Sequence, residues 1–360
     1  MCNFEKKIKI LEIGPSPIRS KGGMASVISG IQEDDFLNAQ YSIDIHESYC
    51  DGGIIKRLLF SAKGFIKFIR IYNKYDIFHI HMACYGSTFR KGYYIRFLKK
   101  HKKKIILHVH GAEYLRFYSG ITEQKKQVVQ KIWKLCDAVI VLSNGWKKQF
   151  ESIFDINTIH VVENGINVAQ YAKGKCDVSK SRDSFLFLGR LGTRKGTYDI
   201  IEAVEKISPS YPNLKVFMAG DGELNHVKEI ITKKGLNNIE IIGWVDFERK
   251  IKLLTQTAAL LLPSYHEGLP MAILESMAAG KVIISTDVGG SPEIIQNDEN
   301  GIIIQPGDIN ALSRAMVKVM TDPVFDLKCS EKNLKKIEEQ FSRTNMHKKI
   351  SHIIDYVAGK

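Results

Sequence analysis

Short, apolar, β-rich runs alternate with amphipathic helical stretches along the whole chain. This alternation is typical of parallel α/β sheets, in which strands are joined by helices that cover the sheet. Between the two groups of runs lies a polar, charged stretch at 172–184 without apolar periodicity, which reads as a linker. We therefore predict an α/β protein with two Rossmann-like domains, 1–171 and 172–342, that face each other across a ligand-binding cleft. The predicted strands are Ile8–Ile13, Ile43–His46, Ile77–His81, Lys104–His110, Ala138–Leu142, Ile159–Val162, Phe185–Leu188, Lys215–Ala219, Ile239–Ile242, Ala258–Leu262, Val282–Ser285 and Gly301–Ile304.

Length and composition agree with two soluble domains. The chain has 360 residues, 44% of them hydrophobic and 25% charged. No apolar stretch is long enough to span a bilayer, and the N-terminus reads as a strand rather than a secretion signal. The six cysteines are scattered, so neither a zinc site nor a disulfide framework is expected, and reduced thiols in a cytosol are the default.

Positive charge is concentrated in the first half. Residues 1–170 hold 26 Lys and Arg against 15 Asp and Glu, whereas the remainder holds 26 against 24. Within 54–74, apolar residues recur at helical spacing with lysines and arginines on another face, and a second basic cluster follows at 96–104. These segments are either ordinary helices with solvated faces or a surface that contacts an anionic membrane. Nucleic acid ranks lowest, because no nucleic-acid motif accompanies the charge.

The clearest chemical motif is a pair of acids, Glu267 and Glu275, around a predicted helix start at Pro270. Free amides at a helix N-terminus attract phosphate. Carboxylates accept hydrogen bonds from vicinal hydroxyls. A phosphate flanked by sugars, as in a nucleotide-sugar, fits both features, whereas the alternative is a solvated helix with two ordinary surface acids.

Two motifs of the first half follow predicted strands. Gly22 and Gly23 open a helix and would let the backbone approach a ligand closely, although a plain turn explains them equally well. His108 and His110 end a strand at the cleft edge, where an imidazole can bond a sugar hydroxyl or can simply be structural. The His-x-His spacing permits a metal site, but we expect none because no third ligand is evident.

In the second half, Arg190 and Lys195 follow a strand and could both reach one diphosphate, unless they are plain surface charges. The segment from Gly220 onward resembles a dinucleotide fingerprint, but Asn225 stands where the third glycine belongs, which argues against an NAD enzyme. The chain has no Asp-x-Asp motif for a metal-bound diphosphate. Charge neutralisation must therefore come from Arg190, Lys195 and helix amides.

Together these residues resemble, in order and position, the retaining glycosyltransferases of the GT-B fold, the large family four, of the bacterial surface-polysaccharide type. The matching residues are Gly22 and Gly23, His110, Glu163–Asn167, Arg190 with Lys195, and Glu267–Glu275. The resemblance implies that Arg190 and Lys195 stabilise the donor diphosphate, which Gly22 and Gly23 approach, and that Glu275 holds the ribose. Glu267, His110 and the amides of Gly268 and Leu269 would hold the hexose, while Gly243 and Val245 would line the base. The last helix, within 343–360, would pack back on the first domain.

By the same resemblance, the chain would be a metal-independent hexosyltransferase without cofactor. The acceptor hydroxyl would attack from the face that the nucleotide leaves, so no protein nucleophile is required. We expect transfer of a hexose or N-acetylhexosamine from a UDP-linked donor to a lipid-linked glycan. The enzyme would be cytoplasmic and peripherally bound to the inner face of the plasma membrane. The alternatives are a GT-B-fold UDP-sugar epimerase and a non-catalytic nucleotide-sugar binding protein.

Overall fold

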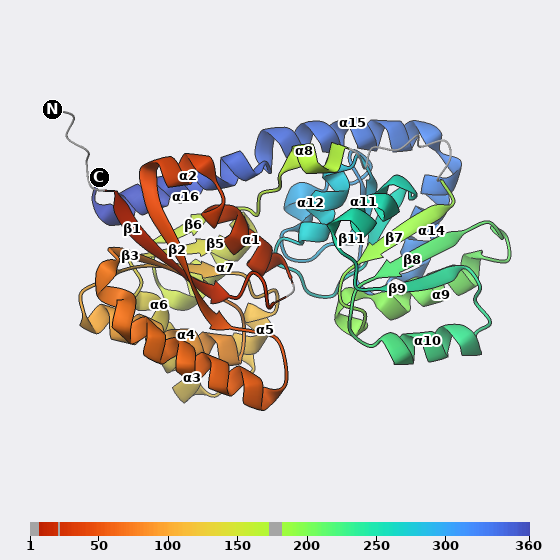
Figure 1. Cartoon of the computed structure of the whole chain (residues 1–360). Helices are drawn as coiled ribbons and strands as arrows, with labels where there is room; N and C mark the ends of the chain where they lie inside the picture. The colour runs from red at the N-terminus through yellow and green to blue at the C-terminus, as the bar shows by residue number, and fades with distance from the viewer. Residues whose placement is uncertain (1–6, 21, 173–181) are drawn as a thin grey trace. The chain divides into compact units, whose positions relative to one another are not determined.

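The computed structural model describes residues 7–20, 22–172 and 182–360. The chain divides into two compact units, one formed by Met1–Gly165 with Arg343–Lys360 and the other by Ile166–Ser342. Each unit is a parallel six-stranded sheet with helices on both faces (Figure 1). The predicted architecture of two Rossmann-like α/β domains is confirmed.

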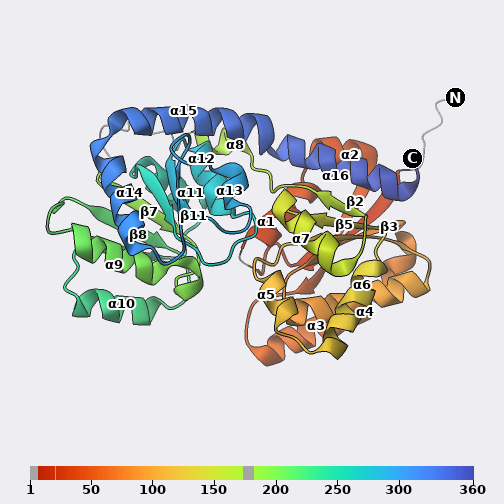
Figure 2. The ribbon, with the colours of Figure 1, turned by 180° about the vertical axis from the view of Figure 1, so that it is seen from behind.

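The first sheet has the strand order β2-β1-β3-β4-β5-β6. Helices α3, α4 and α6 lie along one face, and α2 and α16 lie on the other (Figures 1 and 2). The elements of this unit are β1 (Ile8–Pro15), α1 (Gly23–Gln32), α2 (Asp35–Gln40), β2 (Tyr41–Tyr49), α3 (Ile54–Ile71), η1 (Tyr72–Lys74), β3 (Ile77–Met82), α4 (Gly86–Lys100), β4 (Lys104–Val109), α5 (Tyr114–Ser119), α6 (Glu123–Lys134), β5 (Ala138–Val141), α7 (Asn144–Phe154), β6 (Ile159–Val161) and α16 (Arg343–Ala358).

The second sheet has the strand order β12-β11-β10-β7-β8-β9. Helices α9 and α10 lie on one of its faces and α11 and α12 on the other (Figures 1 and 2). The elements of this unit are α8 (Val168–Tyr171), β7 (Ser184–Leu188), η4 (Thr193–Lys195), α9 (Thr197–Ile207), β8 (Lys215–Ala219), α10 (Leu224–Lys233), β9 (Ile239–Gly243), α11 (Phe247–Thr255), β10 (Ala259–Leu262), α12 (Met271–Ala278), β11 (Val282–Thr286), α13 (Ser291–Ile294), β12 (Ile302–Ile304), α14 (Ile309–Thr321) and α15 (Pro323–Gln340).

Each predicted strand is present within a few residues of its expected bounds. Buried parallel strands are apolar on both faces, so they stand out in the sequence. The first unit ends at Gly165 rather than at the expected Tyr171, because Ile166 donates its N–H to Phe341 O and α8 lies with the second unit. The helix α16 belongs to the first unit. Of the expected linker, residues 173–181 lie outside the described residues.

One face of the first sheet changes character along its strands. Its apolar part joins Ile10, Ile77 and Ile106 to residues of α1, α2 and α16 in one hydrophobic core. Two residues further along each strand, the side chains on the same face are Glu12, His79 and His108. The carboxyl-terminal half of this face is therefore polar although it is fully buried.

Candidate active site

Glu267 lies in the loop between β10 and α12 and is only 5% exposed. Its Oε1 accepts hydrogen bonds from Lys195 Nζ at 2.5 Å and from Ser264 Oγ at 2.7 Å. Lys195 comes from η4, which follows β7, so the carboxyl ends of two neighbouring strands supply the pair. Glu267 is thus a buried, paired acid, and the alternative of an ordinary solvated acid is excluded for it.

Glu275 lies in α12 and is likewise held by a cation. Its Oε1 accepts from Lys250 Nζ at 2.6 Å and from Tyr171 Oη at 3.1 Å. The Lys250 ammonium also lies 5.7 Å from the ring centroids of Tyr171 and Phe247. Lys250 and Tyr171 were not predicted as partners of Glu275, because no local spacing links α8 and α11 to α12.

Arg190 is held more loosely than Lys195. Its side chain is 71% exposed, and its Nη1 lies 3.9 Å from Asp221 Oδ2. Neighbouring backbone bonds, Leu191 N to Asp221 O at 2.6 Å and Gly220 N to Gly243 O at 2.7 Å, bring together the segments that follow β7, β8 and β9. Arg190 and Gly243 therefore lie on the same edge of the second sheet.

Backbone crowding fixes the loops that carry Lys195 and Glu267. Gly196 has φ +69°, and a Cβ there would lie 2.0 Å from Pro263 O. Gly289 has φ +57°, and a Cβ there would lie 2.1 Å from Glu267 O. Only glycine fits such positions without movement of the backbone.

Several helices of the described residues begin without a side-chain cap, and three of them lie at predicted site residues. Gly22 before α1, Gly196 before α9 and Pro270 before α12 make no cap hydrogen bond through a side chain. Uncapped amides are available to an anion. By contrast, the helices α2, α7, α11, α14 and α15 are capped by the side chains of Asp34, Ser143, Asp246, Asp308 and Asp322. Pro270 occupies the N-cap rather than the predicted first helical position, a shift of one residue.

The remaining predicted donor contacts differ in exposure. Gly268 O accepts from Gly290 N at 2.6 Å, which ties the segment before α12 to the one before α13. Leu269 is buried, with only 4% of the residue exposed. Val245 is partly buried after β9, and Gly22 and Gly23 are exposed at the start of α1.

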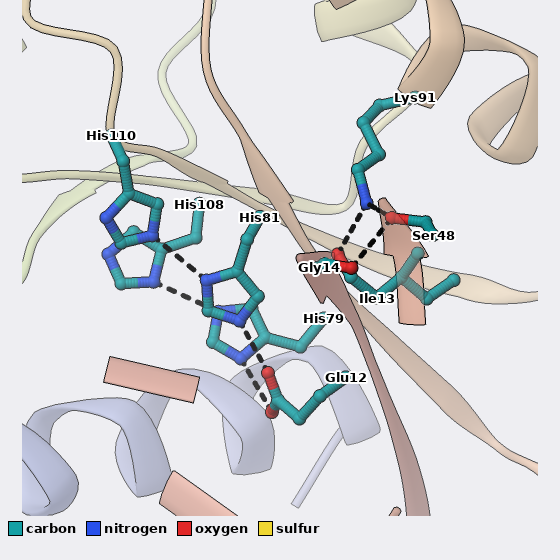
Figure 3. A network of polar contacts seen from close by, with 9 residues as sticks. All are labelled: Glu12, Ile13, Gly14, Ser48, His79, His81, Lys91, His108 and His110. Carbon is teal, nitrogen blue, oxygen red and sulfur yellow. Dashed lines mark hydrogen bonds and ion pairs between the residues drawn. The ribbon is translucent and has the colours of Figure 1, made fainter. Parts of the chain in front are cut away.

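His110 directly follows β4 and is part of a buried histidine cluster in the first unit (Figure 3). Its Nε2 lies 2.9 Å from His81 Nδ1, and His81 Nε2 lies 2.6 Å from Glu12 Oε2. On the other side, His79 Nδ1 lies 2.9 Å from Glu12 Oε1, and His79 Nε2 lies 3.2 Å from His108 Nδ1. Burial lowers the pKa of His110 to about 3 and lowers those of His81 and His108 well below 6.5.

The sequence did not reveal a group of histidines around His108 that has the spacing of a metal site. Ring nitrogens of His79, His81 and His108 all lie within 4.8 Å of one another. The parallel register places Glu12 beside His79 and His81 beside His108, which the sequence alone does not reveal. In the present arrangement these nitrogens are engaged with Glu12, with His110 or with one another, apart from His108 Nε2.

Comparisons with known proteins cover both units. The model of the family "Glycosyltransferase Family 4" matches residues 30–170, and that of "Glycosyl transferases group 1" matches residues 173–337. A glycogen synthase of Mycobacterium tuberculosis is 26% identical over 191 residues, 52% of this chain and 46% of the relative. The Escherichia coli UDP-Gal:alpha-D-GlcNAc-diphosphoundecaprenol alpha-1,3-galactosyltransferase is 29% identical over 228 residues, 58% of this chain and 57% of the relative. The chain thus spans about half the length of the curated relatives that it matches.

A solved structure extends the similarity to the complete fold. Sucrose-phosphate synthase from Thermosynechococcus elongatus superimposes with a TM-score of 0.80 at 17% identity, over 98% of this chain and 100% of the other. At this level of identity the likeness concerns the fold. It is the two-domain GT-B architecture.

Proposed function

We propose that the chain transfers a hexose or N-acetylhexosamine from a UDP-sugar to a lipid-linked glycan with retention of configuration. It belongs to the glycosyltransferases of the GT-B fold, with a family 4 segment followed by a group 1 segment. The galactosyltransferase relative supports the donor and the acceptor class, since its name specifies UDP-Gal and a diphosphoundecaprenol-linked sugar. Assembly of a surface polysaccharide is the pathway proposed.

The observation that carries this proposal is the buried Lys195–Glu267 pair in front of the uncapped start of α12. An ammonium group has three N–H donors, and Glu267 engages one of them. The others are available to a donor diphosphate. Glu267 and the amides of Gly268 and Leu269 then hold the hexose, and Glu275 holds the ribose.

In the proposed reaction, the leaving UDP gains negative charge as the glycosidic bond breaks. Lys195 and the exposed Arg190 stabilise that charge, which is electrostatic catalysis by groups already in place. A donor phosphate oxygen takes the acceptor proton, and no metal ion is required. Gly243 and Val245 line the base.

The surface of α3 supports the proposal of a lipid-linked acceptor. This helix buries only Phe68 among its residues. Large apolar side chains are exposed along it, among them Ile54 at 69%, Ile55 at 75% and Leu58 at 66%. Lysines and arginines on the same helix are Lys56, Arg57, Lys63, Lys67 and Arg70. Exposed apolar residues beside basic ones suit an anionic bilayer, in which the acceptor's lipid resides.

Between α3 and α4 lies a groove of about 630 Å³ with a mainly apolar lining. The groove is lined by apolar and aromatic side chains of both helices and by two arginines: Leu58, Phe65, Phe89, Tyr93, Arg57 and Arg90. We assign this face to the anionic leaflet and the groove to an acceptor hydrocarbon chain. No helix among the described residues is long and apolar enough to cross a membrane.

The proposed function is tested with purified protein and a panel of nucleotide-sugars, scored by release of the free nucleotide. We expect slow hydrolysis of one UDP-sugar and much faster release once a polyprenyl-diphosphate-linked saccharide is added. Release that is independent of acceptor and yields an epimerised donor would indicate an epimerase. Binding without turnover under every condition would indicate a non-catalytic binding protein.

A further inference from the structure

With Glu12 ionised and every imidazole neutral, the contacts of the buried histidine cluster allow one arrangement of protons. Glu12 presents two carboxylate oxygens, and a ring nitrogen of His79 and one of His81 each lie within hydrogen-bond distance of one of them. A carboxylate only accepts, so both nitrogens must carry a proton and donate it.

The assignment then propagates along two branches. A neutral imidazole has one protonated and one bare nitrogen. Since His81 donates through Nε2, its Nδ1 is bare and must accept from His110 Nε2 at 2.9 Å. Likewise His79 donates through Nδ1, so its Nε2 accepts from His108 Nδ1 at 3.2 Å.

The two branches end differently. His108 is fully buried, and its bare Nε2 has no hydrogen-bond partner among the described residues. His110 lies just beyond β4 and is only partly buried. Figure 3 shows its second ring nitrogen pointing away from the cluster. The branch through His81 therefore leads from a buried carboxylate to an accessible lone pair.

We propose that Glu12 is a positioning residue that acts through His81 to hold His110 in its Nε2-protonated tautomer, so that the bare Nδ1 of His110 can accept a hydrogen bond from a sugar hydroxyl. This rests on the proposed function only in its last step, the identity of the ligand. The tautomer itself is a property of the free protein.

The surroundings favour neutral imidazoles. Lys91 is buried, and its Nζ donates to Ile13 O and to Ser48 Oγ beside the cluster (Figure 3). His347 of α16 also interacts electrostatically with Glu12. A positive charge on His81 would face His79, His110 and Lys91, and burial disfavours a charge on His81 and His108.

The first experiment reads the tautomer directly. Protein labelled with 15N-histidine is examined without ligand at pH 7 by long-range proton–nitrogen correlation, with signals assigned from His81→Gln and His110→Gln. We expect His110 and His81 to be Nε2-protonated and His79 and His108 to be Nδ1-protonated. A cationic or Nδ1-protonated His110 would overturn the proposal, and so would a stoichiometric metal ion bound by these histidines.

A matched pair of variants separates the relay from a structural role. Glu12→Leu removes both acceptors at similar volume and should release His110 into mixed tautomers, with a loss of transfer of about tenfold, the value of one hydrogen bond. His79→Asn keeps a donor near Glu12 Oε1 and cuts only the branch to His108. It should leave the His110 signal and the rate near those of the wild type.

The outcomes remain separable from the proposed function. If Glu12→Leu fails to fold, as thermal unfolding would show, the spectrum of the wild type still decides the tautomer. If the tautomers are as expected but no nucleotide-sugar is turned over, the proposed function fails while the hydrogen-bonded relay stands. A Glu12→Leu variant that keeps a single Nε2-protonated His110 contradicts the relay outright.

Discussion

Two lysine–glutamate pairs hold the acids of α12 and its preceding loop in place. In the Lys195–Glu267 pair, the side chains are 13% and 4% exposed, so solvent screens their attraction little. Removal of one partner from such a pair leaves a buried charge and costs about 3–5 kcal/mol of folding free energy. The side chain of Arg190 is 71% exposed and forms no comparable buried ion pair. The two cations assigned to the diphosphate should thus behave differently when they are removed.

For Arg190→Ala, we expect turnover to fall about a hundredfold or more with an unchanged melting temperature, because only an exposed contact to the leaving group is lost. For Lys195→Ala, we expect a similar loss of turnover together with clear destabilisation. Steady-state UDP release and thermal unfolding measure the two effects. Lys234→Ala, which removes a surface partner of Glu205, is the control and should change neither. Near-normal turnover in both test variants would reject the assigned roles.

At the scale of the elements, close backbone packing holds the loops that follow strands β7 and β10 and carry Lys195 and Glu267. Gly196 ends η4 and begins α9 in the left-handed region, directly against Pro263 O. Gly235 follows α10 with a nearly identical φ of +66°, but a Cβ there would meet nothing within 4 Å. The two glycines differ in crowding and hardly in conformation.

Gly235→Ala should cost about 1–2 kcal/mol, the strain of a left-handed alanine, with normal turnover. Gly196→Ala should cost more and should lower turnover, because Pro263 or the loop that carries Lys195 must move. Denaturant unfolding and UDP release measure the pair. Equal effects on stability and rate would show that the close approach at Gly196 plays no part in placing Lys195.

The surface of α3 should govern attachment to anionic membranes. We expect wild-type protein to float with anionic liposomes at low salt and to detach as salt is raised. Replacement of Leu58 and Leu59 by serine should abolish flotation without loss of stability, since both are exposed. The matched control replaces Val324 and Leu327 of α15, which are 73% and 57% exposed. Absence of binding at low salt, or equal loss in both variants, would contradict a bilayer contact at α3.

For the whole molecule, neutral buried histidines make stability depend on pH. Burial, with Lys91 and Lys67 nearby, lowers the pKa of His46 to about 3, and burial lowers that of His110 to about 3. The pKa of a histidine in the unfolded chain is about 6.5. Between these values the unfolded chain binds more protons, so stability present above pH 6.5 is lost as pH falls. Asp326 opposes this, because burial raises its pKa to about 7, and its protonation favours folding as pH falls below 7.

The histidines outnumber the acid, so we expect the free energy of unfolding to decrease from pH 6.5 towards pH 4. Asp326→Asn should steepen that decrease, and His46→Gln should flatten it by up to about 1.4 kcal/mol per pH unit. Chemical denaturation at a series of pH values gives these slopes, and a stability that is flat over this range would contradict neutral burial.

The sequence was sufficient for the architecture but not for the histidine cluster. Most strands contain a short apolar run, so their existence and place are largely local properties. The cluster joins Glu12, His79 and His108 through strand order and register, and these are set by the packing of the complete sheet. The partners of Glu275 lie on α8 and α11, and no spacing in the chain links them to α12.

The central claim is a metal-independent transfer driven by fixed cations at a departing nucleotide. Its most direct test is UDP release from a UDP-sugar, with and without a polyprenyl-diphosphate-linked acceptor, in the presence of excess chelator. We predict that release is stimulated by the acceptor, persists with the chelator and is lost in Lys195→Ala. Release that the chelator abolishes, or that Lys195→Ala retains in full, would contradict the claim.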